Sequence, residues 1–340
     1  MEKTAVLIVN TGSPDRPTIP SVWKYLTQFL NDKRVIDLPW LLRKLLVNLI
    51  IIPFRVKRST ALYKLLWTEN GSPLIQYSNQ LQEKLQEELG DRYEVFLAMR
   101  YQHPGLMKVI AQIRNKKFKK LILFPLYPQY AMSTTGSIVA AVKDELRRQQ
   151  ADTELIIIEQ FYDHPEFIAA FAARGRSYNL SKFDHILFSY HGLPNRHLEK
   201  CHPGIHPDHC TCPDILPGHG HLCYRATCYA TTRLLVSELN LKPDQYSVAF
   251  QSRLSNNWME PFTDDVLLTR LQEGKKRILV FAPAFVTDCL ETLIEISHEY
   301  RSMFLEKGGE ELQLVESLNV DSIWVKAMKS IIISACTPPC

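Results

Sequence analysis

The chain has 340 residues, of which 46% are hydrophobic and 22% charged, and this composition lies in the range of ordinary globular proteins. It excludes a disordered chain, a collagen-like repeat and a long coiled coil. The net charge of +4 is too small to indicate nucleic-acid binding, so no nucleic-acid partner is expected. The length predicts two domains.

Short runs rich in aliphatic and β-branched residues recur along the chain and are expected to be strands. They lie at 5–9, 95–98, 121–125, 155–158, 185–188, 247–250 and 278–282. Helical patterns lie between them, at 78–89, 138–149 and 229–239. This alternation predicts parallel βαβ units. The expected fold class is therefore α/β, with two Rossmann-like, doubly wound halves at residues 1–150 and 151–340.

The longest apolar stretch, residues 39–54, reads PWLLRKLLVNLIIIPF and is followed by the basic turn RVKR. It is shorter than the ~20 residues that span a bilayer, and cations interrupt it. Two interpretations stay open: a segment at a lipid interface, or a buried helix with a basic last turn. The amino terminus has no secretory signal pattern, so the protein is expected in the cytoplasm.

Polar and aromatic side chains follow most of the predicted strands. Ligands of doubly wound sheets bind beyond the carboxyl ends of the strands, so these residues are candidate binding groups. They include Asn10, Thr11, Tyr127, Ser133, Thr134 and His191. No GxGxxG or Walker A pattern is present, so nucleotide binding has no support. A broad cleft for a flat organic ligand fits these residues better.

One histidine and a series of carboxylates are the candidates for reactive chemistry. His191 directly follows a predicted strand and precedes a glycine turn. The carboxylates follow one another at spacings of three, four and four, at Asp288, Glu291, Glu295 and Glu299. This spacing stacks side chains along one face of an α-helix. Such a face is either simply solvated or, if His191 meets Glu291, part of a labile divalent-metal site that also accepts protons.

A segment at residues 201–223 carries four unevenly spaced cysteines, Cys201, Cys210, Cys212 and Cys223. Its many prolines and glycines disfavour a helix or a strand, so something else must order it. Four thiolates suit a [2Fe-2S] cluster or a tetrahedral Zn²⁺ equally well in number, and disulfides are disfavoured in the cytosol. Cys228 begins the next helical pattern and is interpreted as a packing residue.

Eight motifs, taken together and in this order, resemble the ferrochelatase family. They are NTGSPD (10–15), RVIDLPWLL (34–42), TENGSPL (68–74), MRYQHP (99–104), LYPQYAMSTTGS (126–137), FSYHGLP (188–194), FQSR (250–253) and APAFVTDCLETLIEI (282–296). The resemblance covers nearly the whole chain. It implies a chelatase-like fold of two Rossmann-like halves with a cleft between them. It also implies an enzyme of the lyase class that inserts Fe²⁺ into a porphyrin in the last step of haem synthesis.

The resemblance further implies roles for individual residues. His191 and Glu291 match the family's catalytic pair, and Asp288 and Glu295 match further carboxylates that guide the Fe²⁺ substrate with this pair. The porphyrin-binding positions of the family match Asn10, Thr11, Arg100, Tyr101, Tyr127, Ser133 and Thr134. The segment 39–58 matches an apolar lip that receives the porphyrin. Cys289 stands where some members have His, so a mechanism that needs a second imidazole there has no support.

The implied substrates are Fe²⁺ and protoporphyrin IX, which yield protohaem and two protons; coproporphyrin III is the alternative porphyrin. Some bacterial ferrochelatases carry a [2Fe-2S] cluster on a cysteine-rich insertion, so the resemblance favours this cluster over zinc at the four cysteines of 201–223. We expect a monomer or homodimer, cytoplasmic and peripheral on the inner face of the cytoplasmic membrane. The competing functions are porphyrin or iron binding without turnover, and iron–sulfur sensing on the same fold.

Overall fold

The computed structural model describes residues 3–150, 152–201, 204, 209–218 and 220–336. The chain forms two compact units, one of residues 1–127, 131–160 and 320–340 and one of residues 128–130 and 161–319. The predicted halves divide the chain once, near residue 150. The chain instead returns to the first unit near its end, because α12 (Ser322–Cys336) packs on α4 (Pro73–Leu89) and β4 (Glu154–Ile157).

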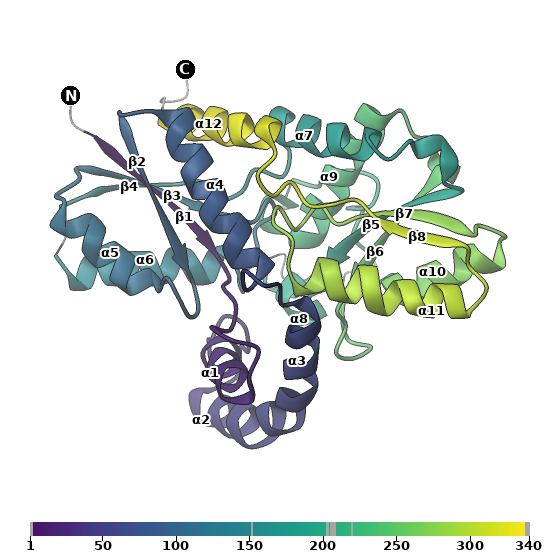
Figure 1. Ribbon diagram of the computed structural model, residues 1–340, viewed down its shortest axis with the longest axis horizontal. Coiled ribbons are helices and arrows are strands. Elements are labelled where there is room, and N and C mark those ends of the chain that lie inside the picture. Colours follow the sequence, from purple (N-terminus) through teal and green to yellow (C-terminus); the bar gives the residue numbers. More distant parts are fainter. Residues whose placement is uncertain (1–2, 151, 202–203, 205–208, 219, 337–340) are drawn as a thin grey trace. The chain divides into compact units, whose positions relative to one another are not determined.

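The first unit contains a parallel sheet in the order β2-β1-β3-β4. Its other strands are β1 (Thr4–Asn10), β2 (Tyr93–Met99) and β3 (Lys120–Pro125). Helices α5 (Leu106–Asn115) and α6 (Thr135–Arg148) cover one face, and α4 and α12 lie on the other (Figure 1). Residues 5–9 of β1 are fully buried, as expected for a strand covered on both faces.

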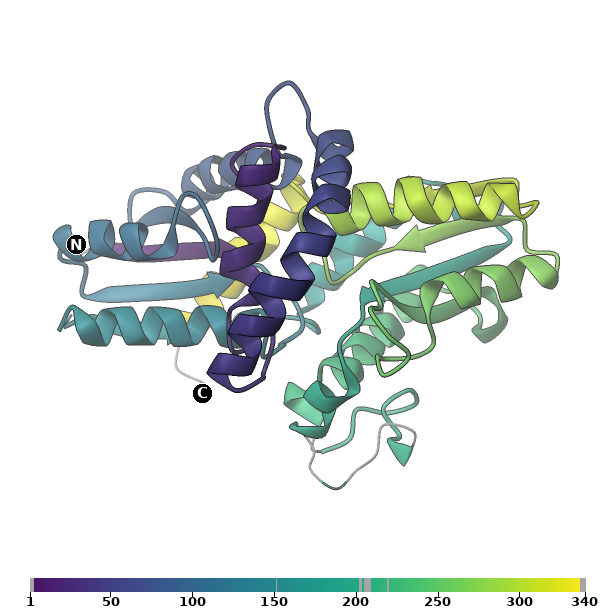
Figure 2. The same ribbon diagram turned by 90° about the horizontal axis from the view of Figure 1, so that it is seen from below.

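A group of helices extends this unit beyond the carboxyl end of β1 (Figures 1 and 2). It consists of α1 (Ile19–Leu30), α2 (Trp40–Leu45), a π-helix at Leu46–Ile51 and α3 (Ile52–Leu66). The last three run on without a break, and α1 packs against α3. Pro53 lies at the junction of the π-helix and α3, so its missing N–H removes one hydrogen bond of this continuous helix without ending it.

The second unit contains a parallel sheet in the order β6-β5-β7-β8. Its strands are β5 (His185–His191), β6 (Tyr246–Gln251), β7 (Arg277–Phe281) and β8 (Glu311–Leu314). Its longer helices are α7 (Pro165–Arg176), α9 (Tyr224–Leu239), α10 (Thr263–Gln272) and a π-helix at Glu291–Tyr300. Shorter ones are α8 (Asn195–Glu199), α11 (Arg301–Glu306) and 3₁₀ turns at Leu180–Lys182, Gly220–Leu222 and Pro243–Gln245.

The two sheets have the same topology, and this confirms the predicted fold class. In each, the first strand lies in the middle, the second pairs on one side of it and the third on the other. The order therefore reverses between β1 and β3 and again between β5 and β7. Ligands of open α/β sheets bind at the carboxyl ends of strands at such switch points. The residues that follow these four strands are thus the ones to inspect.

Close packing fixes the helices on the second sheet. Gly175 of α7 lies directly over the Phe281 ring, and a Cβ at this position would be 2.3 Å from the ring. On the other face, Leu187, Val280 and Ile296 belong to one buried cluster, which ties the π-helix to β5 and β7. The π-helix that carries the predicted glutamates is therefore anchored to the sheet core.

Candidate active site

In the first unit, two hydroxyl groups meet at the switch point of the sheet. Thr11 follows β1 and Tyr127 follows β3, and their side-chain oxygens are hydrogen-bonded to each other. The side-chain oxygen of Asn10 accepts a hydrogen bond from the Thr11 backbone N–H at 2.8 Å. The structure thus brings together three of the residues predicted to bind porphyrin. All three are neutral hydrogen-bonding groups.

A carboxylate that the motifs left unassigned organises the charged part of this unit. Asp32 follows α1, and its Oδ2 accepts hydrogen bonds from Arg100 Nη2 at 2.6 Å, Tyr101 Oη at 3.1 Å and Ser137 Oγ at 2.5 Å. Its Oδ1 accepts the Arg34 backbone N–H at 2.8 Å. Burial opposes ionisation, but these donors and the Arg100 charge together lower the pKa of Asp32. Asp32 is therefore a fixed anion.

Arg100 and Tyr101 are both held by this anion. Arg100 Nε donates a second hydrogen bond to Ser137 Oγ at 2.8 Å, and its guanidinium lies over the Tyr101 ring at 5.0 Å. Burial, and then the Asp32 charge, raises the pKa of the Tyr101 hydroxyl, so Tyr101 stays a neutral donor. The Arg100 charge is compensated, and its position is set by the protein rather than by a ligand.

The remaining predicted porphyrin-binding residues, Ser133 and Thr134, lie in the turn before α6 and are half-buried. Thr134 Oγ1 donates a weak hydrogen bond to the Ala131 carbonyl oxygen at 3.4 Å. Within the described part of the chain, neither side chain is hydrogen-bonded to Asp32 or Arg100. The structure therefore places them on the same unit as the other predicted residues without joining them to that network.

In the second unit, His191 is the last residue of β5, next to the switch point. Its Nδ1 lies 2.7 Å from the Gly192 carbonyl oxygen, which can only accept a hydrogen bond. Nδ1 therefore carries the hydrogen, and Nε2 keeps a lone pair when the ring is neutral. The ring has aromatic neighbours in Trp258 and Phe285, with centroid distances of 6.5 and 6.4 Å. Nε2 is the atom that can take a proton or bind a cation.

Gln251 links the end of β5 to the helix of the predicted glutamates. It lies opposite His191 in the pairing of β5 and β6. Its Nε2 donates to the Glu291 backbone oxygen at 3.0 Å and to Glu295 Oε2 at 2.9 Å. Its Oε1 accepts a hydrogen bond from Ser189 Oγ at 2.8 Å. Gln251 was not among the predicted site residues, although the FQSR motif contains it.

The predicted α-helix with four carboxylates on one face is corrected in two respects, the type of helix and the place of Asp288. Glu291, Glu295 and Glu299 lie in a π-helix, and Asp288 precedes it. In a π-helix each N–H bonds to the carbonyl five residues earlier, so a turn holds more residues than an α-helical turn. A π-helical turn therefore holds slightly more than four residues, and a spacing of four stays close to one full turn, so Glu291, Glu295 and Glu299 remain along one side of the helix.

Glu295 is bound by donors on several sides. Besides Gln251, Ser252 Oγ donates to its Oε2 at 2.5 Å and Tyr300 Oη donates to its Oε1 at 3.0 Å. Burial, and then the Glu295 charge, raises the pKa of Tyr300, which keeps this donor protonated. Both carboxylate oxygens of Glu295 are thus engaged by the protein.

The Glu291 carboxylate is hydrogen-bonded with the thiol of Cys289. Burial and then the Glu291 carboxylate raise the pKa of Cys289, so Cys289 is a protonated, buried thiol at this position.

Asp288 is buried, with 3% of its surface exposed. Its Oδ1 accepts hydrogen bonds from Thr292 Oγ1 at 3.0 Å and the Ser317 backbone N–H at 3.3 Å. Its Oδ2 accepts one from Asn319 Nδ2 at 2.7 Å. The carboxylate holds the start of the π-helix against the chain at 317–319. Among the described residues, no group of three or more His, Cys, Asp or Glu side chains forms a ready metal site.

The predicted cysteine insertion is partly described; residues 202–203, 205–208 and 219 lie outside the described part. None of Cys201, Cys210, Cys212 and Cys223 forms a disulfide. Burial first, and then the nearby Cys201 and Cys210, raise the pKa of Cys223 to about 11, although the backbone N–H groups of Ala226 and Arg225 act in the opposite direction. Burial also raises the pKa of Cys212, with Cys210 and Cys223 as neighbours. The four thiols therefore lie close enough to influence one another.

Cys223 and Cys228 differ in what surrounds their sulfur atoms. Cys223 is the N-cap residue of α9, where the backbone N–H groups of Arg225 and Ala226 donate to its sulfur. Cys228 lies one turn further along α9, is fully buried and is hydrogen-bonded with Tyr224. Cys223 thus receives two backbone N–H donors that partly offset the effect of its burial, whereas Cys228 packs in the interior.

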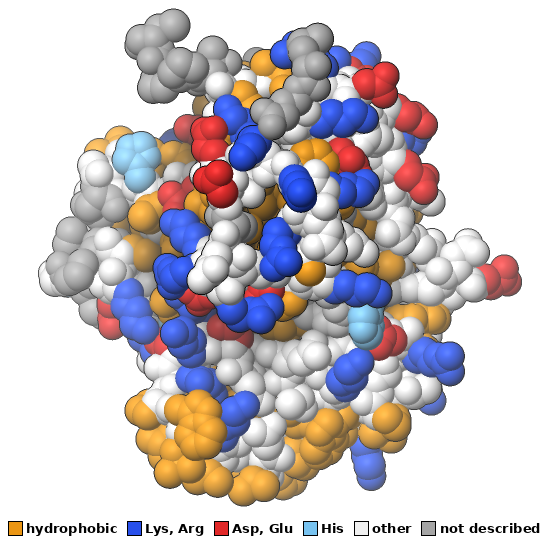
Figure 3. Space-filling model, turned by 90° about the vertical axis from the view of Figure 1, so that its left-hand side faces the viewer, with side chains coloured by type: hydrophobic (Ala, Val, Ile, Leu, Met, Phe, Trp, Pro, Cys, Tyr) orange, Lys and Arg blue, Asp and Glu red, His pale blue; other side chains and the backbone are white. Residues whose placement is uncertain are grey.

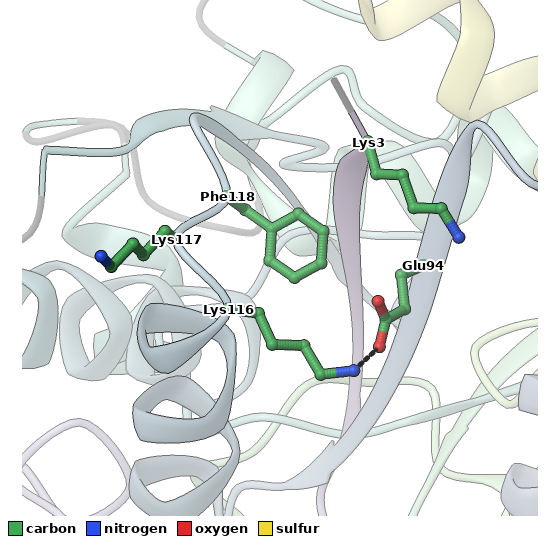
Figure 4. Close-up of a pocket in the computed structure, with 5 residues that line it drawn as sticks. All are labelled: Lys3, Glu94, Lys116, Lys117 and Phe118. Carbon is green, nitrogen blue, oxygen red and sulfur yellow. Dashed lines mark hydrogen bonds and ion pairs between the residues drawn. The ribbon is translucent and has the colours of Figure 1, made fainter. Parts of the chain in front are cut away.

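A hollow of about 230 Å³ lies at the opposite, amino-terminal end of the first sheet (Figure 4). It is lined by Lys3, Glu94, Lys116, Lys117 and Phe118, and Lys116 pairs with Glu94. None of the predicted site residues lies there.

A sequence model of the ferrochelatase family matches residues 3–336 of the chain. The chain belongs to the ferrochelatase family. Ferrochelatases of Coxiella burnetii (strain Dugway 5J108-111) and Pseudomonas fluorescens (strain Pf-5) are 43% and 42% identical to it over 331 and 334 residues. The alignments cover 96% and 97% of this chain and 92% and 98% of those proteins. This ferrochelatase is therefore a metal chelatase of haem synthesis, acting on iron and a porphyrin, as the motifs implied.

Solved structures of the sirohydrochlorin chelatase SirB from Bacillus subtilis are similar in fold. A cobalt complex from subspecies spizizenii has a TM-score of 0.55 at 10% identity, and a structure with Fe³⁺ has a TM-score of 0.56 at 9% identity. Each alignment covers 98% of this ferrochelatase and 95% of the other chain. These comparisons confirm the chelatase-like fold. Among the described helices, none has the length and hydropathy that crossing a bilayer requires.

Proposed function

We propose that this ferrochelatase inserts Fe²⁺ into protoporphyrin IX to form protohaem, a reaction of the lyase class. Two inner N–H protons must leave the free-base porphyrin as the metal enters. The observation that carries the proposal is the 2.7 Å hydrogen bond from His191 Nδ1 to the Gly192 carbonyl, because it leaves Nε2 as the acceptor. A neutral imidazole accepts protons near pH 7. His191 Nε2 takes one pyrrole proton, releases it to water, and then takes the second.

Glu291 is the carboxylate that we assign beside His191. The Gln251 side chain holds the Glu291 backbone, and the Gln251 backbone lies opposite His191 in the sheet, so this one residue connects the strand of His191 to the helix of Glu291. The Glu291 carboxylate lowers the net charge of the entering cation and offers it an oxygen ligand that exchanges readily.

Asp288 and Glu295, the other two residues proposed to guide Fe²⁺, have a different environment. Each already accepts three hydrogen bonds from protein donors. Direct iron ligation would require some of these bonds to break. We therefore propose that they attract the cation by charge and keep the π-helix in place, while His191 and Glu291 meet it.

The porphyrin-binding residues that we propose lie on the first unit. They are Asn10, Thr11, Arg100, Tyr101, Tyr127, Ser133 and Thr134. Arg100 and Tyr101 are fixed by Asp32, and Thr11 and Tyr127 by each other. Fixed groups favour one shape of the macrocycle, and a bent ring exposes its nitrogen lone pairs to the metal more than a flat one does.

The direct test is haem formation by the purified protein with Fe²⁺ and protoporphyrin IX, followed by absorbance, with coproporphyrin III in a parallel reaction. We expect the higher kcat/KM with protoporphyrin IX. A higher value with coproporphyrin III would replace the substrate and keep the chemistry. Tight porphyrin binding without turnover would contradict the enzyme and support the binding-protein alternative.

For the cysteine segment we propose a [2Fe-2S] cluster, with zinc as the alternative. The donor set fits such a group in kind and number, since four thiols lie near one another and two backbone N–H groups donate to the Cys223 sulfur. Within the described part of the chain the four thiols do not form a ready metal site as they stand, so the bound group would have to draw them together. Cys201, Cys210, Cys212 and Cys223 would hold it, and its negative thiolates would order the proline-rich segment. Iron insertion by Fe²⁺ transfers no electrons, so no step of the reaction passes through this group.

Anaerobically purified protein tests the cluster. We expect a visible absorption spectrum with iron and acid-labile sulfide, lost in Cys223→Ser and kept in Cys228→Ser. Colourless protein that contains zinc would contradict the cluster and support the alternative.

Peripheral membrane attachment through residues 39–58, in the cytoplasm, is also proposed. Trp40 is 66% exposed, Leu49 66% and Phe54 82%, so the buried-helix interpretation of this segment does not describe these side chains. Apolar side chains gather at the end of the molecule formed by α1–α3, the lower end of the view in Figure 3. Such a surface binds at a lipid interface without spanning it.

A further inference from the structure

The helical segment at residues 16–66, which contains α1, α2 and α3, concentrates the positive charge of the protein. It has ten Lys or Arg residues and two Asp residues, a net charge of +8, whereas the whole chain has +4. The rest of the chain is therefore net negative. One of the two acids, Asp32, is already paired with Arg100. A segment of this charge is attracted to an anionic surface.

A hollow of about 410 Å³ lies on the flank of this segment, between residues 17–20 and α3. Lys57, Thr60, Ala61 and Lys64 line it from α3, and all its lining residues are neutral or basic. The two lysines lie two helical turns apart, about 10 Å along the axis. Both are exposed, and within the described part of the chain neither ammonium has an ion-pair partner. The hollow thus presents two uncompensated cations.

Exposed apolar side chains adjoin this hollow. Ile19, which lines it, is 46% exposed, and Trp23, one turn further along α1, is 39% exposed. Phe54, the most exposed large apolar residue at 82%, lies one turn before Lys57 on α3. Cations that line a hollow beside apolar side chains match the boundary between lipid headgroups and acyl chains.

We infer that this hollow binds the phosphate of an anionic phospholipid headgroup while the neighbouring apolar side chains enter the bilayer surface. The inference rests on the proposed membrane attachment of residues 39–58 and adds the lipid class that the segment selects. Lys57 and Lys64 supply charge-assisted hydrogen bonds to the phosphate, and Thr60 and Ala61 between them leave room for it.

Vesicle co-sedimentation tests this without porphyrin or iron, so its result is independent of the chelatase reaction. Wild-type protein is compared on vesicles of phosphatidylcholine alone and of equal parts phosphatidylcholine and phosphatidylglycerol. The test variant is Lys57→Gln with Lys64→Gln. The matched control, Lys44→Gln with Arg55→Gln, removes the same charge from the same segment outside the hollow. The melting temperature of each variant verifies folding; Arg55, Lys57 and Lys64 are exposed and Lys44 is half-buried, so none of the four changes falls in the core.

We expect wild-type protein to bind the anionic vesicles more tightly than phosphatidylcholine alone. The affinity for the anionic vesicles should fall about 25-fold in the Lys57 and Lys64 variant, or about fivefold per lysine. It should fall clearly less in the control variant. On phosphatidylcholine alone the two variants should bind alike. Equal losses in both variants would overturn the inference, because charge alone would then account for binding. Wild-type binding that does not differ between the two kinds of vesicle would overturn it as well.

Discussion

The two units have one topology and two different sets of residues at equivalent places. After β1 and β3 the first unit has Thr11 and Tyr127, joined through their hydroxyl groups. At the end of β5, the corresponding strand, the second unit has His191, with Phe285 of the chain that follows β7 as its neighbour. The same parallel sheet thus presents neutral hydrogen-bonding groups in one unit and an imidazole in the other.

The carboxylates of the two units differ in the same way. Asp32 of the first unit is paired with the Arg100 guanidinium. Glu291 and Glu295 of the second unit lie in a π-helix, and the side chains that donate hydrogen bonds to Glu295, those of Gln251, Ser252 and Tyr300, are all neutral. Function in these folds belongs to the residues after the strands and not to the sheet. We interpret the first unit as the one that binds the organic ring and the second as the one that handles protons and iron.

The largest expected effect tests the second unit. His191→Ala removes Nε2, so kcat for haem formation should fall by about 10² to 10⁴, the usual range for loss of a general base. Absorbance of haem in steady state measures it. His298→Ala, which changes an exposed histidine of the same unit, serves as the control and should keep its rate. A rate near that of the wild type in His191→Ala would contradict the assignment.

The next effect tests the first unit. Asp32→Asn keeps the shape but leaves Arg100 without its counter-charge, so the porphyrin KM should rise about tenfold, as a lost hydrogen bond to a charged group costs. The change in kcat should be much smaller. Steady-state kinetics with varied porphyrin separates the two constants. Asp91→Asn, an exposed acid of the same unit, should alter neither. A fall in kcat alone would contradict the division between the units.

A smaller effect is expected from the hydroxyl pair. Thr11→Val and Tyr127→Phe each remove one partner of a neutral hydrogen bond, so each should raise the porphyrin KM a few-fold. Because the two hydroxyls bond to each other, the double variant should cost less than the two single effects combined. A strictly additive double variant would show that the pair does not act as one group.

The smallest effect at neutral pH concerns stability. Burial, and then the charges of Arg270 and Lys275, lower the pKa of His185 from 6.5 to about 4. Between these values the unfolded chain binds more protons than the folded one, so stability is complete above pH 6.5 and is lost as the pH falls toward 4. His185→Asn should flatten this dependence. Urea unfolding at about pH 7.5 and about pH 5 measures it. An unchanged slope in the variant would show that other groups control acid sensitivity.

Much of the fold could be predicted because buried parallel strands are apolar at consecutive positions, as in residues 5–9 and 278–282. β8 (Glu311–Leu314) was not predicted, since a four-residue edge strand with alternating burial carries little signal. The return of α12 to the first unit depends on contacts far apart in the chain, and local patterns do not report these. The π-helix was taken for an α-helix because side-chain spacing alone does not reveal which carbonyl each N–H reaches.

The candidate site shows the same limit. His191 and Tyr127 were found because each directly follows a strand. Asp32 and Gln251 were not, since a single acid after a helix and an amide at a strand end are ordinary in sequence. Asp32 does stand out as one of only two acids in the basic segment 16–66. Its partners Arg100 and Ser137 lie 68 and 105 residues away, so only the folded chain reveals the network.

The most direct test of the account is a porphyrin titration of His191→Ala, followed by quenching of protein fluorescence. We assign His191 to proton transfer and to iron and not to holding the ring. This assignment predicts a porphyrin Kd within a few-fold of the wild-type value in a variant whose turnover is lost. A Kd that weakens in parallel with kcat would contradict it, because His191 would then act mainly by binding the porphyrin.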